Sequence, residues 1–180
     1  MLEIKRHIFH IFFGTMIGLL FYLGILNKVH FAILTVLAAI MFWFYKHYKF
    51  PILHQIMMSL EREHNIHKYP GIGAFYYMLG CTIAVWLYST EIATASIFIV
   101  AWGDGVAGLL RSHSTKRIKT WSSTIFAILV SVIAAQYFVT LNKAIISSII
   151  TMIVERFDIK LDDNLYIPIL SGLIMTFFIF

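Results

Sequence analysis

The sequence has few charged residues and a single cysteine. Only 13% of its residues are Asp, Glu, Lys or Arg, whereas about 25% is typical of soluble globular domains. Because 60% of the residues are hydrophobic, the chain cannot cover a water-facing surface in the usual way, and we expect it to lie mostly in lipid. Cys81 is the only cysteine, which excludes an internal disulfide. Its apolar surroundings favour a packing role.

Several motifs of well-known enzyme classes are also missing. The chain has no G-x-S-x-G, no Walker A sequence and no H-E-x-x-H. G-x-G-x-x-G does occur at Gly103–Gly108, but its flanks read as membrane helix rather than as the strand and helix of a dinucleotide-binding unit. His7 with His10, and His64 with His67, have helical spacing. No further Cys or His matches them, so we expect no zinc site.

Apolar runs close to membrane-spanning length dominate the sequence. A spanning helix needs about 20 mainly apolar residues. The runs are His7–Leu26, Phe31–Tyr45, Ile72–Tyr88, Ile92–Leu110, Trp121–Leu141, Ala144–Val154 and Tyr166–Phe180. They predict an all-α integral membrane protein, a single domain over residues 1–180 built as a polytopic bundle of about seven transmembrane helices. Ala144–Val154 is the shortest run: either its polar neighbours add a turn, or it is a re-entrant segment.

The distribution of charge predicts the orientation. With about seven spans, all 14 Lys and Arg residues except Lys28 and Lys143 fall on one side. Since positive loops face the cytoplasm, we expect a cytoplasmic N-terminus and an external C-terminus, in the plasma membrane of a prokaryote or the endoplasmic reticulum of a eukaryote. This pattern fits anionic lipid head groups and not nucleic acid. All Asp and Glu residues except Glu91 fall on the same side, and because orientation does not need the acids, they predict a polar site there.

One long polar connector, about residues 46–71, separates the second and third runs. Its middle part, Ile52–His67, has apolar residues at helical spacing followed by charged ones. We expect an amphipathic helix that lies at the cytoplasmic membrane surface. Pro70 and Gly71 end it before the next span.

An acid inside the fourth run is the most informative single residue. Asp104 is flanked by Gly103 and Gly105 near the predicted cytoplasmic end. A charge within a membrane helix costs about 2.5–3.5 kcal/mol on insertion scales, so intramembrane acids usually have a function. The glycines would let another helix, a metal ion or a phosphate approach. The alternative is an Asp that pairs with Lys or Arg for packing alone.

Two polar segments could act together with Asp104. The segment Arg111–Thr120 carries closely spaced cations that could neutralise a polyphosphate, or it could be an ordinary positive-inside loop. In Glu155–Asn164, Asp162 and Asp163 stand beside an Asn. These are the oxygen ligands that Mg²⁺ prefers when it also binds phosphate, although a solvated turn is the alternative.

Taken in order, these clusters resemble the dolichol kinase and phytol kinase family of CTP-dependent membrane lipid kinases, which is related to the phosphatidate cytidylyltransferases. The matching residues are Glu3, Arg6 and His10; Arg62, Pro70-Gly71-Ile72-Gly73-Ala74 and Gly80; Gly103, Asp104 and Ala107; Lys119 and Thr120; and Glu155, Asp162-Asp163-Asn164-Leu165 and Pro168. The last element is more similar to the kinases than to the cytidylyltransferases. One departure concerns the residues after Thr120: the family usually has an acid followed by Gly and Ser, whereas this chain has Trp121, Ser122 and Ser123.

The resemblance implies Mg²⁺-assisted phosphoryl transfer from CTP to the hydroxyl of a membrane lipid alcohol, such as diacylglycerol or a polyprenol. It implies catalytic roles for Asp104, Lys119 and Asp163. The residues that would bind CTP, the phosphoryl donor, are Arg111, Lys116, Thr120, Asn164, Arg6, His10 and Glu3. The residues that would hold Mg²⁺ are Asp104, Asp162, Asp163 and Glu155.

Three other functions stay open at this point. The nearest is cytidylyl transfer to a lipid phosphate, which gives a CDP-lipid. A small ion-coupled transporter would use Asp104 as its ion site. A non-catalytic relative is suggested by Ser122, which stands where the family usually has an acid.

Overall fold

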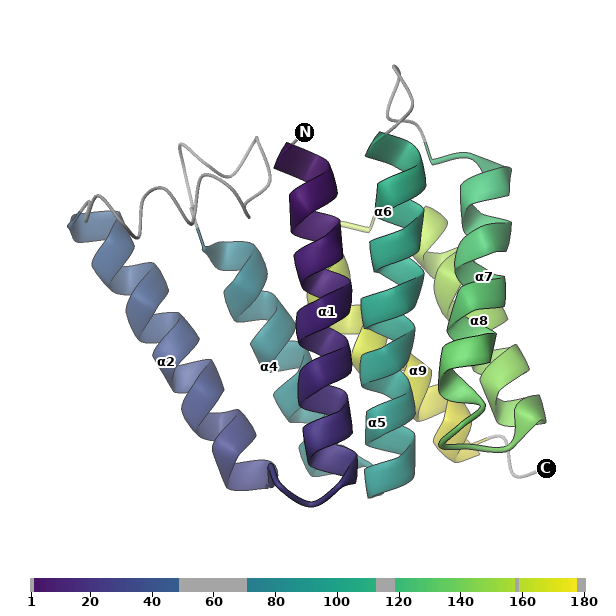
Figure 1. Cartoon of the computed structure of the whole chain (residues 1–180), viewed down its shortest axis with the longest axis horizontal. Coiled ribbons are helices and arrows are strands. Elements are labelled where there is room, and N and C mark those ends of the chain that lie inside the picture. The colour runs from purple at the N-terminus through teal and green to yellow at the C-terminus, as the bar shows by residue number, and fades with distance from the viewer. Residues whose placement is uncertain (1, 49–70, 113–118, 158, 178–180) are drawn as a thin grey trace.

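Helices make up all the regular structure of the described part of the chain, which covers residues 2–48, 71–112, 119–157 and 159–177 of a computed structural model. In chain order the elements are α1 (Leu2–Tyr22), α2 (Lys28–His47), α4 (Ile72–Leu87), α5 (Thr90–Phe98), η1 (Ile99–Asp104), α6 (Gly105–Ser112), α7 (Trp121–Ala135), α8 (Leu141–Arg156) and α9 (Asp163–Phe177). The elements α5, η1 and α6 follow without a break and form one rod, hereafter the central rod (Figure 1). The prediction of an all-α protein is therefore confirmed for these residues. The predicted amphipathic helix Ile52–His67 lies outside the described residues.

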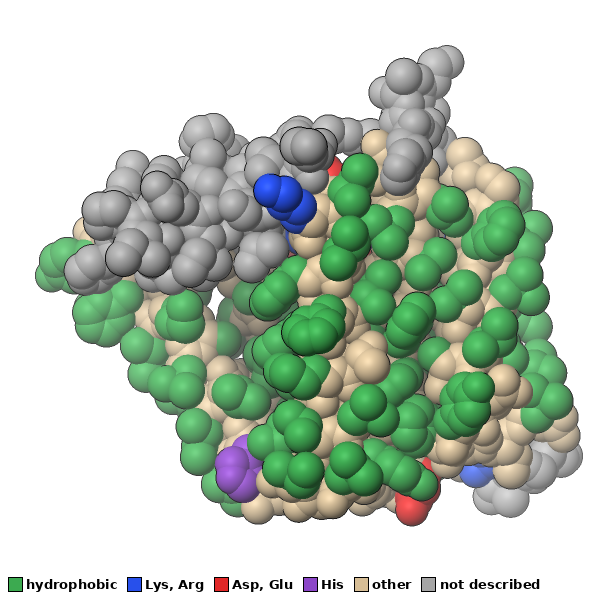
Figure 2. All heavy atoms as spheres, in the orientation of Figure 1, with side chains coloured by type: hydrophobic (Ala, Val, Ile, Leu, Met, Phe, Trp, Pro, Cys, Tyr) green, Lys and Arg blue, Asp and Glu red, His purple; other side chains and the backbone are tan. Residues whose placement is uncertain are grey.

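Among the described residues, three helical segments are long and apolar enough to cross a membrane: Glu3–Tyr22, Lys28–Tyr45 and Thr90–Ser112. The helices α4 and α7 are also apolar but shorter. Figure 2 shows hydrophobic side chains over the middle of one face of the bundle, with the visible charged side chains near its two ends. The structure thus has the character of a helical membrane protein. The number of crossings and their orientation stay predictions.

The helix ends differ from the apolar runs in ways that polar contacts explain. Helix α1 begins at Leu2 rather than at His7, because Glu3 and Arg6 pair with each other at 2.9 Å and can be included in the helix. Helix α9 begins at Asp163 rather than at Tyr166. There the side chain of Asp162 accepts the N–H of Asn164 at 3.0 Å and caps the first turn.

Two helices differ in length from the apolar runs that predicted them. The run Ala144–Val154 is extended at both ends to α8, Leu141–Arg156, so its polar neighbours do add turns. The run Trp121–Leu141 was too long, because α7 ends at Ala135 and residues 136–140 form the turn to α8. Residues 137–139 are apolar, and hydrophobicity alone does not mark a turn.

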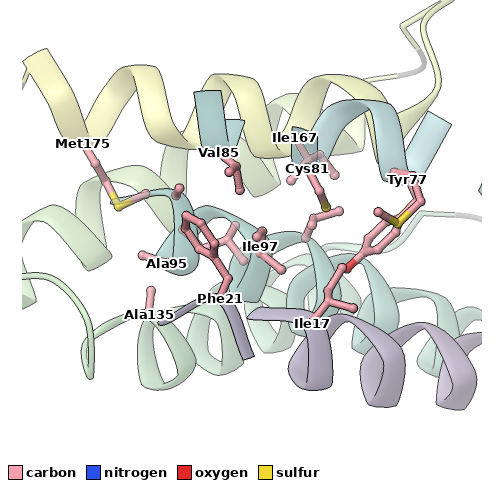
Figure 3. Close-up of a cluster of buried hydrophobic side chains, with 14 of the residues drawn as sticks. Ile17, Phe21, Tyr77, Cys81, Val85, Ala95, Ile97, Ala135, Ile167 and Met175 are labelled. Atoms are coloured by element: carbon pink, nitrogen blue, oxygen red, sulfur yellow. The ribbon is translucent and has the colours of Figure 1, made fainter. Parts of the chain in front are cut away.

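The core lies around the central rod, which packs against α1 on one side and against α4, α7, α8 and α9 on others. Figure 3 shows part of this core, where Ile17 of α1, Cys81 of α4 and Ile97 of α5 are buried together. Helix α2 packs mainly against α4, with one aromatic contact to α1, where the rings of Phe31 and Phe21 lie 5.4 Å apart. It therefore forms one edge of the bundle (Figure 1).

Helices α4 and α9 approach each other closely at Gly80. A methyl group added there would lie 2.5 Å from the backbone oxygen of Asn164. Pro168 of α9 has no N–H, so it cannot bond the carbonyl of the residue four positions before it, which is Asn164. This contact fixes the first turn of α9, and with it Asp163, against α4.

Candidate functional site

The rod contains a wide helical turn that ends at its buried acid, Asp104. The segment η1 is a π-helix that ends at Asp104, a form that occurs mostly as short segments and often at functional sites. The Asp104 side chain is buried, with 5% of the residue exposed. A methyl group at Gly103 would lie 2.4 Å from Ser131 Oγ of α7, and one at Gly105 would lie 2.4 Å from Ile11 of α1. The flanking glycines thus let two helices close around the acid.

Three acids from separate helices meet at this point. One carboxylate oxygen of Asp104, one of Glu155 and one of Asp163 all lie within 4.8 Å of one another. Glu155 stands near the end of α8 and is 1% exposed, whereas Asp163 in the first turn of α9 is partly exposed. We refer to these three residues as the acid triad. Carboxylates so buried and so close need cations, because their mutual repulsion and lost hydration are costly.

Two side-chain cations contact the triad. Arg111 spans two of the acids: its Nη2 lies 3.5 Å from Asp104 Oδ1, and its Nη1 donates to Glu155 Oε1 at 2.9 Å. Lys119 Nζ lies 3.3 Å from the same Glu155 oxygen and also donates to the Glu155 backbone oxygen. The structure therefore brings together Asp104, Glu155, Asp163, Arg111 and Lys119, which the sequence analysis had named from three separate segments.

The start of α9 gives different tasks to neighbouring residues. Asp162 lies outside the triad, and its side chain caps the helix. Its expected binding of Mg²⁺ stays a prediction. Asn164 is buried: its Nδ2 donates to the Gly73 backbone oxygen at 3.4 Å, and its Oδ1 has no hydrogen-bond partner among the described residues. Tyr166 Oη donates to Asp163 Oδ1 at 2.9 Å.

Tyr166 is a site residue that the sequence analysis did not name. Its position could have been found, because residues three apart lie on the same helix face and Tyr166 follows Asp163 by three. The hydroxyl holds the one acid of the triad that is only partly buried.

The N-terminal candidates Glu3, Arg6 and His10 lie on the part of α1 that packs against η1 and α6. His10 Nε2 is 3.3 Å from the Val100 backbone oxygen, in the π-helix that ends at Asp104. Arg6 pairs with Glu3, and its Nη2 lies 2.9 Å from His7 Nε2. A methyl group at Gly108 of α6 would overlap the His7 ring. The polar end of α1 is thus held directly against the helix that carries Arg111.

The remaining candidates lie at the start of α7. Thr120 caps this helix by accepting the N–H of Ser123 at 3.2 Å. Trp121 lies under the guanidinium of Arg156, 4.1 Å from the ring centroid, and Arg156 donates to the Lys119 backbone oxygen at 2.8 Å. The residues that depart from the family pattern therefore begin a helix and help to fix Lys119. Lys116 lies outside the described residues.

The triad fits a divalent cation. A bound Mg²⁺ or Ca²⁺ ion keeps its oxygen ligands about 2.0–2.6 Å away, so they can be about 4–5 Å from one another. The oxygens of the acid triad lie within 4.8 Å of one another, which is close to the spacing that one ion requires. Arg and Lys beside such a group are the side chains that bind phosphate best. The fold and the site thus define a membrane-type helical protein with a buried cluster suited to a cation and a phosphorylated ligand.

Comparison with known proteins supports a kinase relationship. No protein-family model and no solved structure matches the chain. An uncharacterized protein of Methanocaldococcus jannaschii is 28% identical over an alignment of length 187, gaps included, which covers 98% of this chain and 94% of that protein. The proteins named CTP-dependent diacylglycerol kinase 1 of Eremothecium gossypii and Saccharomyces cerevisiae are each 27% identical, over 67% and 66% of this chain.

The matches to the two kinases span about half of their length, 48% and 51% respectively. The chain is therefore a distant relative of CTP-dependent diacylglycerol kinases over about two thirds of its own length. The finer resemblance to dolichol and phytol kinases stays a prediction.

Proposed function

We propose that this protein is a CTP-dependent lipid kinase, which transfers the terminal phosphoryl group of CTP to the hydroxyl of a membrane lipid alcohol. The observation that carries this proposal is the meeting of Asp104, Glu155 and Asp163 with Arg111 and Lys119 at one end of the bundle. The distant relationship to the two diacylglycerol kinases supports the choice of CTP and of a lipid acceptor.

The proposed roles follow from the charges of the side chains. The acid triad would hold Mg²⁺, which neutralises charge on the phosphates when it is bound. Arg111 and Lys119 would bind the transferred phosphoryl group through charge-assisted hydrogen bonds. Phosphoryl transfer needs positioning and charge stabilisation more than covalent help, and these buried, mutually held side chains supply both.

The reaction forms one bond and breaks another. The lipid hydroxyl oxygen bonds to the terminal phosphorus of CTP, and the bond from that phosphorus to the bridging oxygen of CDP breaks. The hydroxyl proton is released, and CDP and the lipid phosphate leave. Asp104 precedes α6, whose eight residues correspond to about 12 Å of helix. Asp104 therefore lies about 12 Å below the end of α6. In this proposal the hydroxyl of an inner-leaflet lipid enters the site from the side at the depth of Asp104.

The proposed topology has about seven spans, a cytoplasmic N-terminus and a cytoplasmic site. It is supported by the positions of the charges along the helices. The site residues lie at the start of α1, the end of α6, the start of α7, the end of α8 and the start of α9. The three charged residues that are predicted on the other side stand at helix starts away from these site residues: Lys28 in α2, Glu91 in α5 and Lys143 in α8.

A product assay tests the proposal. The full chain in lipid nanodiscs is incubated with CTP, Mg²⁺ and one of three lipid alcohols: diacylglycerol, a polyprenol or a shorter prenol. We expect CDP and the corresponding lipid phosphate. Formation of pyrophosphate and a CDP-lipid would replace the kinase by a cytidylyltransferase. If there is no turnover and CTP with Mg²⁺ does not raise the melting temperature, the protein is a non-catalytic relative or a transporter.

A neighbouring pair of acids gives the matched control for this assay. D163N removes a member of the triad, whereas D162N changes only the residue that caps α9. We expect D163N to abolish lipid phosphorylation and D162N to keep most of it, with rates compared at equal amounts of folded protein. Equal losses in the two variants would contradict the assigned metal site.

A further inference from the structure

Arg111 lies where a divalent cation would have to bind. Its guanidinium contacts Asp104 of η1 and Glu155 of α8 at 3.5 and 2.9 Å, so it bridges two of the three acids. Both acids are almost completely buried, and little water is available to screen one positive charge from another. A guanidinium and a metal ion cannot occupy the same carboxylate oxygens at full strength.

The helix geometry explains why Arg111 reaches this place. Arg111 follows Asp104 by seven residues, which is about two helical turns, so both face the same side of the rod. Side chains on a helix point back toward its N-terminus, which directs the long Arg111 side chain to Asp104. Lys119 reaches the triad at Glu155.

We propose that Arg111 is the built-in counter-ion of the acid triad and makes cation binding depend on the nucleotide. Without nucleotide, the guanidinium neutralises Asp104 and Glu155 and competes with the metal ion. The triphosphate offers Arg111 a better partner, because its oxygens accept two parallel hydrogen bonds from the planar guanidinium. Once Arg111 has turned to the phosphates, its guanidinium no longer competes with the metal ion for Asp104 and Glu155, while Lys119 still contacts Glu155. This inference rests on the proposed function for the identity of the nucleotide.

Binding of the two ligands is then cooperative. By linkage, whatever factor the nucleotide adds to the affinity for the cation, the cation adds to the affinity for the nucleotide. Mg²⁺ would thus not remain bound to the protein between turnovers, and the arginine would keep the buried acids neutralised in the meantime.

Binding of Mn²⁺ tests the inference without any turnover. Electron paramagnetic resonance measures free Mn²⁺ during a titration of the full chain in nanodiscs, with and without a β,γ-methylene analogue of CTP. We expect wild-type protein to bind Mn²⁺ alone weakly and the analogue to tighten binding by about tenfold or more. R111M should bind Mn²⁺ alone about tenfold more tightly than wild type, and the analogue should then add little.

K143M is the control, because Lys143 is a cation on α8, as Glu155 is an acid on α8, but stands at the start of the helix and not at its end. It should behave like wild type. The inference is overturned if R111M binds Mn²⁺ no more tightly than wild type, or if K143M tightens binding equally. If R111M does not fold, the titrations of the wild-type protein test the inference. Equal Mn²⁺ affinity of the wild-type protein with and without the analogue would then overturn it.

The two proposals can fail separately. If the product assay shows CTP turnover but the Mn²⁺ affinity does not depend on Arg111, the kinase proposal is kept and the counter-ion role of Arg111 is rejected. If R111M binds Mn²⁺ more tightly but the wild-type protein phosphorylates no lipid, the counter-ion role is kept and the kinase proposal is rejected.

Discussion

Helix α2 and the central rod are both long and apolar enough to cross a membrane, yet they lie in opposite surroundings. In the apolar window of α2, 17% of the residues are buried, against 78% in the rod. The rod is rich in Gly and Ala, which allow close helix contact in a membrane, whereas α2 exposes large side chains such as Ile33 and Leu37. Side-chain size, together with the presence of an acid, therefore distinguishes the inner helix from the edge helix where apolarity does not.

The strongest test of this comparison removes the charge of the buried acid of the rod, Asp104. D104N should lower the rate of lipid phosphorylation by about 100-fold or more, the size typical of losing one preorganised electrostatic group. E91Q is the control, because Glu91 is an exposed acid at the other end of the same rod. Its rate should equal that of wild type. A full rate for D104N, measured by release of CDP, would remove the functional distinction between the rod and α2.

The second test addresses close packing. In G80A the added methyl group meets the backbone oxygens of Asn164 and Leu165, which cannot move as side chains do. We expect a loss of about 1–3 kcal/mol in the free energy of unfolding, measured by denaturant titration in detergent. V36L, on the exposed face of α2, also adds volume and should change stability by less than about 0.5 kcal/mol. If both variants are equally stable, the inner bundle is no more tightly packed than its edge.

Tyr166 tests whether one hydrogen bond from a hydroxyl positions an acid of the triad. Y166F removes the bond to Asp163, and hydrogen bonds to charged groups contribute about 1.5–3 kcal/mol. We expect the rate at a fixed Mg²⁺ concentration to fall by about tenfold, and the Mg²⁺ concentration for half-maximal rate to rise. The exposed Tyr137 provides the control Y137F. A lower melting temperature without any change in Mg²⁺ dependence would make Tyr166 a packing residue.

The smallest effect is expected where α2 meets α4. Thr35 Oγ1 and Thr82 Oγ1 lie 2.7 Å apart, so one hydroxyl can donate to the other, and they lie 3.0 and 3.1 Å from the Phe31 backbone oxygen. A double-mutant cycle with T35V and T82V should give a coupling of about 0.6 kcal/mol, as is usual between membrane helices. The measurement is again the free energy of unfolding in detergent. A coupling above about 2 kcal/mol would show that α2 is held as firmly as the inner helices.

Sequence reasoning predicted the helices and named most of the residues that the structure brings together, because both depend on local patterns. Apolar runs locate helices, and a charge within such a run stands out, as Asp104 does. The ends of α1 and α9 were missed because they depend on polar contacts, namely the pair of Arg6 with Glu3 and the cap from Asp162. These contacts become visible only when the side chains are placed.

The distribution of tasks within the site could not be predicted. Asp162 and Asp163 are adjacent and chemically identical, but on a helix they differ by about 100° in direction. Only the packing of α9 on α4 decides which of them faces Asp104. The bridge of Arg111 between Asp104 and Glu155 likewise depends on how α8 meets the rod, and neither the residue types nor their spacing contain that information.

The π-helix at Ile99–Asp104 has a consequence for the length of the chain. Its hydrogen bonds span five residues instead of four, so the rod contains one residue more than a regular helix would need there. Deleting a single residue from this segment, for example Val100, would therefore restore a regular helix and leave α6 facing nearly the same way relative to α5. A deletion within α5 or α6, where there is no extra residue, would instead turn the residues that follow it by about 100°. The π-helix is therefore the segment of the rod where the chain can change its length by one residue while Asp104 and Arg111 still face α8 and α9.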